Sequence, residues 1–222
     1  SCKRPNLQQL PRKENIRGIY LPSEGYLLYA VDYAQLELCA LAQTCLEWQG
    51  ESRMAEVIND GQDLHSWFAA AILGKDVGLV TKEERQIAKA CNFGFPGGLG
   101  IRTFQVFAVS NYDIELPLDR CKELKRMWLD AFPEMKKHLK PQPDQTYSSE
   151  EDQTYITRTT TGRIRRNASY CSACNNPFQG LAADGARLAL WFLFLDRFRM
   201  VNFIHDEIIF ELGELDPQLQ SK

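Results

Sequence analysis

The sequence predicts an α+β fold, in which strand patterns near both ends of the chain flank a mostly helical middle. Near the C-terminus, the segment 200–212 holds two runs of β-branched and aromatic residues, separated by His205, Asp206 and Glu207. Such runs around a short polar stretch predict a β-hairpin with two acids at its tip. Near the N-terminus, the short apolar run 26–32 follows a turn-forming stretch and predicts a buried strand.

Composition limits the classes of protein to which the chain can belong. With 222 residues, of which 44% are hydrophobic, the chain is long enough to bury a core and is not of the disordered class. It has no run of 18 apolar residues and no signal peptide, and its seven cysteines are spaced without a framework. We therefore expect a cytoplasmic protein that does not enter a membrane. The formal net charge of −3 does not exclude DNA, because local patches contact phosphates.

The strand over 26–32 ends at Asp32, and a helix is expected to begin a few residues later. The apolar positions that give the helical period are Leu36, Leu38, Leu41, Ala42 and Leu46. Glu37 falls in the first turns of this helix. An acid at a strand end that opens onto a helix is in a usual position for a functional carboxylate.

Asp63 is expected to cap a helix over 64–73, and Gly74 is expected to end it. His65 falls in the first turn of this helix. An ordinary surface histidine is the alternative to a functional one, and the spacing alone does not separate the two.

A further helix, expected over 81–95 and capped by Thr81, carries a basic face. Arg85, Lys89 and Phe93 are four residues apart, so they drift by only ~40° per step around the helix and share one face. Two cations beside an aromatic ring would suit a triphosphate and its base. A solvated basic stripe explains the same spacing.

The second half of the chain mixes helix, strand and loop patterns. An amphipathic helix is expected over 118–132, and a flexible insertion or linker over 140–152. The segment 157–166 predicts a basic hairpin, which either touches phosphates or turns in solvent. The segment 175–180 contains a proline and is expected to break the chain before an apolar helix over 181–198.

Three groups of residues that are distant in sequence together indicate phosphoryl transfer. Asp32 ends a strand, and Asp206 and Glu207 form an acid pair on a hairpin. Arg85 and Lys89 supply cations on a helix face. Carboxylates of this kind can hold two Mg²⁺ ions, while cations hold the phosphates.

These residues resemble the motifs of the family A, or DNA polymerase I-like, DNA polymerases. Residues 32–38 (Asp-Tyr-Ala-Gln-Leu-Glu-Leu) resemble motif A, and 205–207 (His-Asp-Glu) resemble motif C. Arg85, Lys89 and 92–94 (Asn-Phe-Gly) resemble motif B. The further segments that match the family in order are 5–8, 61–65 and 175–180. The resemblance covers nearly the whole chain.

The resemblance implies a right-hand polymerase fold without its thumb, in a fragment of a larger enzyme. An antiparallel-sheet palm domain, at 1–48 and 165–222, would be interrupted by a mostly helical fingers domain at 49–164. The implied activity is template-directed DNA synthesis in replication, with two Mg²⁺ ions for which Mn²⁺ can substitute. The implied partners are primer-template DNA, dNTPs and replication accessory proteins, bound by a monomer in a bacterium or an infected host cell.

The resemblance also implies roles for individual residues. Metal binding is assigned to Asp32, Asp206 and the carbonyl of Tyr33. Catalytic roles are assigned to Asp32, Asp206, Glu207 and Lys89. The residues expected to bind the nucleotide are Arg85, Lys89, Phe93, His65, Gln35 and Glu37. The residues expected to contact DNA are Arg12, Lys13, Asn175, Gln179, His205 and Arg163. Glu37, with Phe93, is expected to exclude a ribose 2′-hydroxyl, and Phe93 in place of Tyr is expected to disfavour dideoxynucleotides.

Three positions depart from the family pattern. Ala34 replaces the usual Ser of motif A, and Cys39 replaces a common Arg. Gly97 occupies the place of a Tyr that covers the template base in the open form, so template positioning and fidelity are in question. The Pro-Gly-Gly sequence there is more like divergent phage or plasmid polymerases. A two-metal nuclease and a catalytically impaired DNA-binding scaffold are the alternative functions.

Overall fold

The computed structural model describes residues 18, 20–140, 147–149, 154–204 and 206–213. The chain divides into two compact units. The first, called here the sheet unit, consists of residues 1–36 and 185–222, and the second, the helical unit, consists of residues 37–184. Within the part of the chain that is described, no helix has both the length and the apolar character needed to cross a bilayer.

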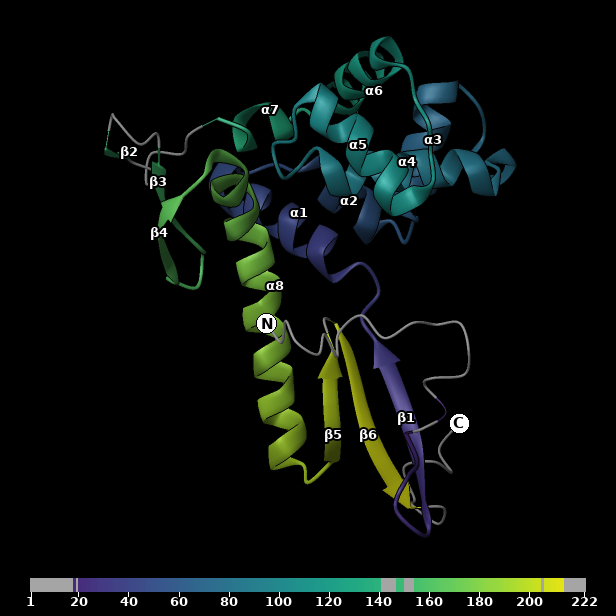
Figure 1. Ribbon diagram of the computed structural model, residues 1–222, viewed down its shortest axis with the longest axis vertical. Helices are drawn as coiled ribbons and strands as arrows, with labels where there is room; N and C mark the ends of the chain where they lie inside the picture. The colour runs from purple at the N-terminus through teal and green to yellow at the C-terminus, as the bar shows by residue number, and fades with distance from the viewer. Residues whose placement is uncertain (1–17, 19, 141–146, 150–153, 205, 214–222) are drawn as a thin grey trace. The chain divides into compact units, whose positions relative to one another are not determined.

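The sheet unit is built on three antiparallel strands in the order β1-β6-β5 (Figure 1). Strand β1 (Tyr26–Asp32) pairs with β6 (Glu207–Gly213), which pairs in turn with β5 (Arg199–Ile204). Both the first strand and the C-terminal hairpin are thus confirmed. The prediction that β1 is buried is wrong, since Leu27 is 43% exposed and Val31 54% exposed. Among the described residues, β1 lies at the edge of this sheet and pairs with β6 alone.

A buried carboxylate joins the strands at the end of the sheet where β1 begins. Glu211 is only 6% exposed, and it accepts hydrogen bonds from the Ser23 backbone N at 2.6 Å and the Ser23 hydroxyl at 3.1 Å. Arg199 Nε lies 3.0 Å from the same carboxylate, and its guanidinium lies over the ring of Tyr26. Because an unpaired buried charge is costly, these contacts are what allow Glu211 to stabilise the sheet.

The helical unit packs its helices around an aromatic core. Its first elements are α1 (Leu36–Gln49), which begins at the last residue of the sheet unit, α2 (Arg53–Asn59), α3 (Leu64–Leu73), a 3-10 turn (Val77–Leu79), α4 (Lys82–Gly94), α5 (Ile101–Tyr112), α6 (Leu118–Ala131) and α7 (Met135–His138). In the core, the ring of Phe95 lies 4.1 Å from that of Phe104 and 5.6 Å from that of Trp128, and all three side chains are fully buried. The core thereby joins the end of α4 to α5 and α6.

The predicted helix caps are confirmed. Asp63 caps α3 by accepting a hydrogen bond from the backbone N of Ser66 at 2.8 Å, and Gly74 ends the helix with a φ of 61°. Thr81 and Glu84 form a capping box at the start of α4, in which each side chain accepts from the other residue's backbone N. These caps fix where α3 and α4 begin, and hence which side chains lie on their facing surfaces.

A second antiparallel sheet, in the order β2-β3-β4, belongs to the helical unit. The predicted hairpin over 157–166 is confirmed as β3 (Thr154–Arg158) and β4 (Ile164–Ala168), with Gly162 at a φ of +90° in the turn. The linker predicted over 140–152 lies partly outside the described residues. Its residues Tyr147–Ser149 form strand β2, because they pair with β3.

Helix α8 (Tyr170–Leu195) runs without interruption through 175–180, so the predicted break there is wrong. Pro177 lacks one backbone donor and costs the helix about 3 kcal/mol. Apolar packing on both sides of the proline outweighs this cost; the buried residues are Ala173, Cys174, Phe178, Ala182 and Ala186. Gly180 allows close contact with β3 and its turn, since a Cβ there would lie 2.4 Å from the Thr159 methyl group.

Candidate active site

The acids predicted to bind metal lie at one end of the sheet in the sheet unit. The register of β1 with β6 places Asp32 opposite Glu207. The backbone N of Tyr33 donates a hydrogen bond to the Asp206 carbonyl at 3.2 Å. Asp32 is exposed, whereas Asp206 and Glu207 are half-buried. Pairing of distant strands thus brings three acids to the same end of one sheet.

The donor atoms at this sheet end suit a hard cation. Asp32 and Asp206 offer carboxylates, and main-chain carbonyls such as that of Tyr33 are hard oxygen ligands too. Among the residues that the structure describes, no group of three or more His, Cys, Asp or Glu is arranged to hold a metal ion. Two carboxylates are still enough for Mg²⁺, because this ion usually takes its other ligands from water and substrate phosphates.

Gln35 follows the acidic end of β1 in an unusual conformation. Its φ is 57°, in the left-handed region that residues other than glycine rarely adopt. Its side-chain oxygen is buried and accepts no hydrogen bond from the described residues. A strained backbone and an unpaired buried acceptor both cost free energy, and such features cluster at ligand sites. They support Gln35 as a candidate ligand-binding residue.

The basic face of α4 lies in the helical unit, where an aspartate holds its first cation. Arg85 makes two contacts with Asp63, from Nε to Oδ2 at 2.8 Å and from a terminal nitrogen to Oδ1 at 2.9 Å. Burial acts to raise the pKa of Asp63, but hydrogen bonds from Arg85 and Ser66 outweigh it and lower the pKa to about 2. Lys89 is half-buried and makes no ion pair or hydrogen bond with any residue that the structure describes. Its ammonium group is therefore available to an anion.

His65 packs against this basic face. It is only 2% exposed, so the alternative of a surface histidine is wrong. Its ring lies 5.5 Å from that of Phe93. Burial lowers the pKa of His65 to about 4. The negative charge of Asp63 acts to raise this pKa, whereas the positive charges of Arg85 and Lys89 lower it further. The ring is therefore neutral at pH 7. Because α4 is a continuous helix over Lys82–Gly94, the prediction that Arg85, Lys89 and Phe93 share a face is confirmed.

Glu37 lies in the first turn of α1, as predicted, and its charge acts on a residue that the sequence analysis missed. Burial, assisted by the negative charge of Glu37, raises the pKa of Tyr112 to about 12. Tyr112 ends α5, and no motif in the sequence marks it. The negative charge at the start of α1 thus acts on the end of α5.

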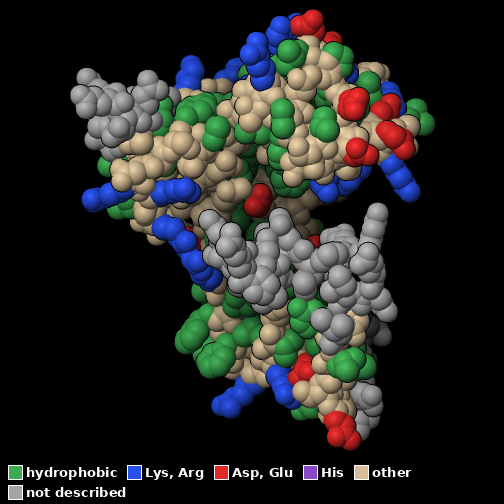
Figure 2. Space-filling view, viewed as in Figure 1, with side chains coloured by type: hydrophobic (Ala, Val, Ile, Leu, Met, Phe, Trp, Pro, Cys, Tyr) green, Lys and Arg blue, Asp and Glu red, His purple; other side chains and the backbone are tan. Residues whose placement is uncertain are grey.

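The residues predicted to contact DNA differ from one another in their exposure and in their contacts. Arg163 forms an ion pair with Asp184, which also accepts a hydrogen bond from Thr161. Gln179 is exposed on α8. In Figure 2, basic side chains lie over the β3–β4 hairpin, where the exposed arginines are Arg158, Arg165 and Arg166. The positions that lie outside the described residues are Arg12, Lys13 and His205.

The residues after α4 pack against the start of α8. A Cβ on Gly97 would lie 2.7 Å from the side-chain amide of Asn175, and one on Gly98 would lie 2.6 Å from the ring of Tyr170. Asn175 is itself held by a hydrogen bond from its Nδ2 to the Cys171 carbonyl at 2.9 Å. A side chain at position 97 would therefore clash with Asn175 on α8.

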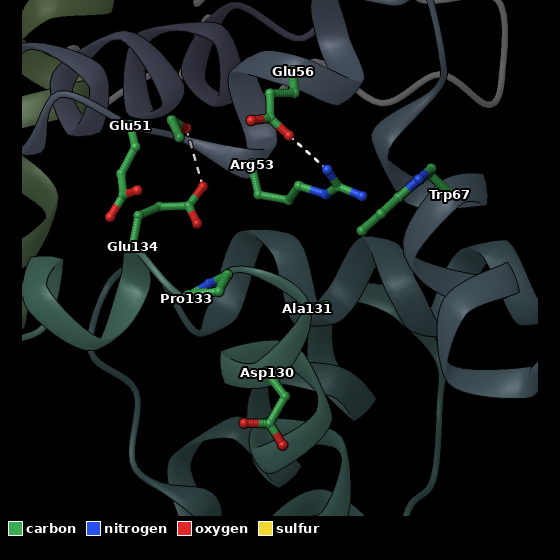
Figure 3. Close-up of a pocket in the computed structure, with 9 residues that line it drawn as sticks. Glu51, Arg53, Glu56, Trp67, Asp130, Ala131, Pro133 and Glu134 are labelled. Atoms are coloured by element: carbon green, nitrogen blue, oxygen red, sulfur yellow. Dashed lines mark hydrogen bonds and ion pairs between the residues drawn. The ribbon is translucent and has the colours of Figure 1, made fainter.

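A pocket of about 450 Å³ in the helical unit contains none of the predicted site residues (Figure 3). It is lined by Glu51, Ser52, Arg53, Glu56, Trp67, Asp130, Ala131, Pro133 and Glu134. Several of these side chains satisfy one another, since Arg53 pairs with Glu56 at 2.6 Å and Ser52 donates to Glu134 at 3.0 Å. Their contacts serve the fold of the helical unit.

Acids at the end of an antiparallel sheet and cations on a helix face are the residue types that metal-dependent proteins use to act on nucleotides. Comparison with known proteins is more specific. The model of the family described as DNA polymerase family A matches residues 1–218. The chain belongs to DNA polymerase family A.

Curated relatives include DNA polymerase I of Aquifex aeolicus, which is 30% identical over 220 residues, with 95% of this chain and 36% of the relative covered. The thermostable DNA polymerase I of Thermus aquaticus is 28% identical over 231 residues, with 95% of this chain and 26% of the relative covered. The chain therefore spans only a minor part of the length of these relatives. Both are bacterial, so the expected phage- or plasmid-like origin is not confirmed.

A solved structure supports the same assignment. The POL domain of Pol1 from M. smegmatis, in complex with DNA primer-template and dNTP, matches with a TM-score of 0.73 at 26% identity. The match covers 96% of this chain and 39% of that chain. It confirms the predicted α+β polymerase fold.

Proposed function

We propose that this chain carries out template-directed DNA synthesis, by adding dNTPs to a primer 3′-hydroxyl with release of pyrophosphate. The observation that carries the proposal is the position of Asp32 beside the turn that holds Asp206 and Glu207, fixed by the β1–β6 register and the hydrogen bond from Tyr33. Membership of DNA polymerase family A supports it, as does the likeness to a structure solved with primer-template and dNTP.

In this proposal, Asp32, Asp206 and the Tyr33 carbonyl hold two Mg²⁺ ions, for which Mn²⁺ can substitute. When bound, such ions lower the pKa of an attacking hydroxyl and neutralise the charge of the leaving pyrophosphate. The exposure of Asp32 gives a hydrated ion access to its carboxylate. Glu207, opposite Asp32 in the ladder, adds negative charge that favours cation binding.

The helical unit would bind the incoming nucleotide. Lys89 would offer the phosphates an ammonium group that pairs with none of the described residues, and the guanidinium of Arg85 is already oriented by Asp63. Phe93 would pack beside the nucleotide and, with Glu37, exclude a ribose 2′-hydroxyl. Gln35 would offer the same ligand its side-chain oxygen, which accepts no hydrogen bond from the described residues.

The DNA would be contacted by residues on several segments, namely Arg12, Lys13, Arg163, Asn175, Gln179 and His205. The palm would comprise 1–48 and 165–222, and the fingers 49–164. Replication accessory proteins would be further partners of the monomer.

Primer extension by the natural protein that contains this chain tests the proposal. With Mg²⁺, dNTPs and a primed template, Asp206→Ala should reduce extension by ~10³-fold or more, because ion binding supplies several kcal/mol of transition-state stabilisation. Asp196→Ala is the matched control, since Asp196 is an exposed aspartate of the same unit. Full extension by Asp206→Ala would overturn the proposal.

Two further measurements separate the alternatives. Release of nucleotides from DNA in the absence of dNTPs, lost in Asp206→Ala, would favour a two-metal nuclease. DNA binding without any Mg²⁺-dependent binding of dNTPs would favour a scaffold.

A further inference from the structure

Three buried side chains of the helical unit form a chain of hydrogen bonds that leads to His65. Trp128 Nε1, on α6, lies 3.0 Å from Asn92 Oδ1, on α4. Asn92 Nδ2 lies 3.1 Å from His65 Nδ1, on α3, and 3.4 Å from the Leu64 carbonyl oxygen. Trp128 and Asn92 are completely buried and His65 is 2% exposed, so water does not compete for these bonds.

The indole of Trp128, at one end of this series of hydrogen bonds, determines which atom donates and which accepts in each of them. The indole N–H of Trp128 can only donate, so the atom of Asn92 that faces it must be the oxygen. The amide nitrogen of Asn92, which also only donates, then faces His65 Nδ1. Rotating the amide by half a turn would set two donors against each other at Trp128 and two oxygens against each other at Leu64, leaving buried groups unpaired. His65 Nδ1 must therefore accept.

An accepting Nδ1 determines where the proton of the ring lies. Burial, with the charges of Arg85 and Lys89, lowers the pKa of His65 to about 4, so the ring is neutral at pH 7. A neutral imidazole carries one proton, which must then be on Nε2. Nε2 makes no hydrogen bond with any residue that the structure describes. Its N–H is thus left for a ligand beside the basic face of α4.

We propose that Trp128 and Asn92 are positioning residues that hold His65 as its Nε2–H tautomer, so that the ring donates a hydrogen bond to an anionic oxygen of the incoming nucleotide. The inference rests on the proposed function for the ligand, but not for the tautomer. In the opposite tautomer, Nε2 would present a lone pair to that oxygen and repel it. The fixed tautomer gives a donor without the cost of placing a buried cation beside the charges of Arg85 and Lys89.

Trp128→Phe tests the direction of these hydrogen bonds, because it keeps an aromatic ring and removes the donor. Without the indole N–H, only the long contact of Asn92 Nδ2 with the Leu64 carbonyl oxygen, at 3.4 Å, still favours the original amide orientation, so a fraction of His65 should adopt the other tautomer. We expect a rise in the KM for dNTP of about threefold to tenfold, the effect of one hydrogen bond, with a smaller change in kcat. Phe132→Leu is the matched control, since Phe132 is a buried aromatic residue in contact with Trp128 that has no donor.

The tautomer itself is measured by NMR on the full protein with ¹⁵N-labelled histidine, in which protonated and unprotonated ring nitrogens have distinct shifts. The His65 signals are assigned by their loss in His65→Gln. We expect an unprotonated Nδ1 at pH 7 in the wild type and in Phe132→Leu, and averaged shifts in Trp128→Phe.

Asn92→Asp supplies a second test that does not depend on loss of packing. Its carboxylate can accept from Trp128 but cannot donate to His65, so Nδ1 should become protonated and the KM for dNTP should become pH-dependent near neutrality. A protonated Nδ1 in the wild type would overturn the inference, as would unchanged shifts and KM in a folded Trp128→Phe protein. Because the NMR result requires no catalysis, it can succeed or fail independently of the primer-extension test.

Discussion

The acidic end of the sheet unit and the basic face of the helical unit differ in how their side chains are held. At the sheet end, Asp32 is exposed, and its carboxylate makes no hydrogen bond or ion pair with the described residues. On the basic face, Asp63 holds Arg85 by two contacts, and His65 is buried behind it. Backbone pairing positions the acid, whereas side-chain packing positions the cation.

The acids of the sheet end and the side chains of the basic face should therefore respond differently to mutation. The carboxylate of Asp32, which has no partner among the described residues, gains a fixed geometry when a cation binds, so its loss should affect activity and leave the fold intact. Side chains that pair with one another, as Asp63 and Arg85 do, contribute both to activity and to the stability of the fold.

Asp32→Asn should reduce primer extension by ~10³-fold or more and leave the thermal midpoint unchanged. The amide binds Mg²⁺ far less well than the carboxylate, and the exposed side chain has no partner to lose among the residues that the structure describes. Extension assays and thermal unfolding on the same samples measure both effects. A clear fall in the midpoint, absent in Asp196→Asn, would show that Asp32 stabilises the fold and would break the contrast.

Glu134→Ala should lower the free energy of unfolding by about 3 kcal/mol, because it leaves buried donors unpaired. Glu134 is 4% exposed and accepts from the Ser52 hydroxyl at 3.0 Å and the Met54 backbone N at 2.9 Å. Urea unfolding gives the stability, and extension below the midpoint should be retained. Glu51→Ala, at an exposed acid lining the same pocket, is the control and should cost little.

The pH dependence of stability should come from the buried histidines of the helical unit. Burial lowers the pKa of both His65 and His138 to about 4, from an ordinary value of 6.5. Above pH 6.5 both are neutral in either state. As the pH falls from 6.5 towards 4, only the unfolded chain takes up the protons, so stability falls by up to about 1.4 kcal/mol per pH unit for each histidine.

Urea titrations at pH 7, 6 and 5 measure this slope. In the double variant His65→Gln, His138→Gln, the unfolded chain should take up nearly two fewer protons on acidification, so the slope of stability against pH should be correspondingly smaller. A slope that is the same in the double variant would place the titrating groups elsewhere and weaken the idea that the helical unit holds its polar groups by burial.

Thr81→Ala should cost about 1 kcal/mol, the usual value of a lost helix cap. Thr81 accepts from Glu84 at the start of α4, one turn before Arg85. Because Asp63 holds Arg85 from α3, the KM for dNTP should stay near its wild-type value. A KM that rises as strongly as in an Arg85→Ala variant would show that the cap, rather than Asp63, orients the basic face.

The parts of the fold that depend on local signals were predictable. Asp63, Gly74 and Thr81 mark helix ends because caps satisfy backbone groups within one turn. The hairpin at 200–212 follows from its apolar runs, and the acid at the end of 26–32 from the same periodicity. Since β1 and the hairpin do pair, the acids that were singled out as separate patterns lie at one sheet end.

The features that were missed depend on contacts between distant parts of the chain. Pro177 is a helix breaker by propensity, and only packing shows that α8 continues through it. Arg85 finds its partner 22 residues away at Asp63, and Trp128 finds Asn92 at a separation of 36. No periodicity connects such positions. The palm and fingers boundaries and the residue roles stay predictions.

The contact between Gly97 and Asn175 has a consequence for how this chain can diverge. The backbone at Gly97 does not have the positive φ that excludes larger residues, so the obstacle to a tyrosine there is the Asn175 amide. Gly97→Tyr alone must displace that amide from the Cys171 carbonyl, whereas Gly97→Tyr combined with Asn175→Ala opens the space first. A tyrosine at position 97 is therefore reached with least disturbance in two steps, with the change at Asn175 first.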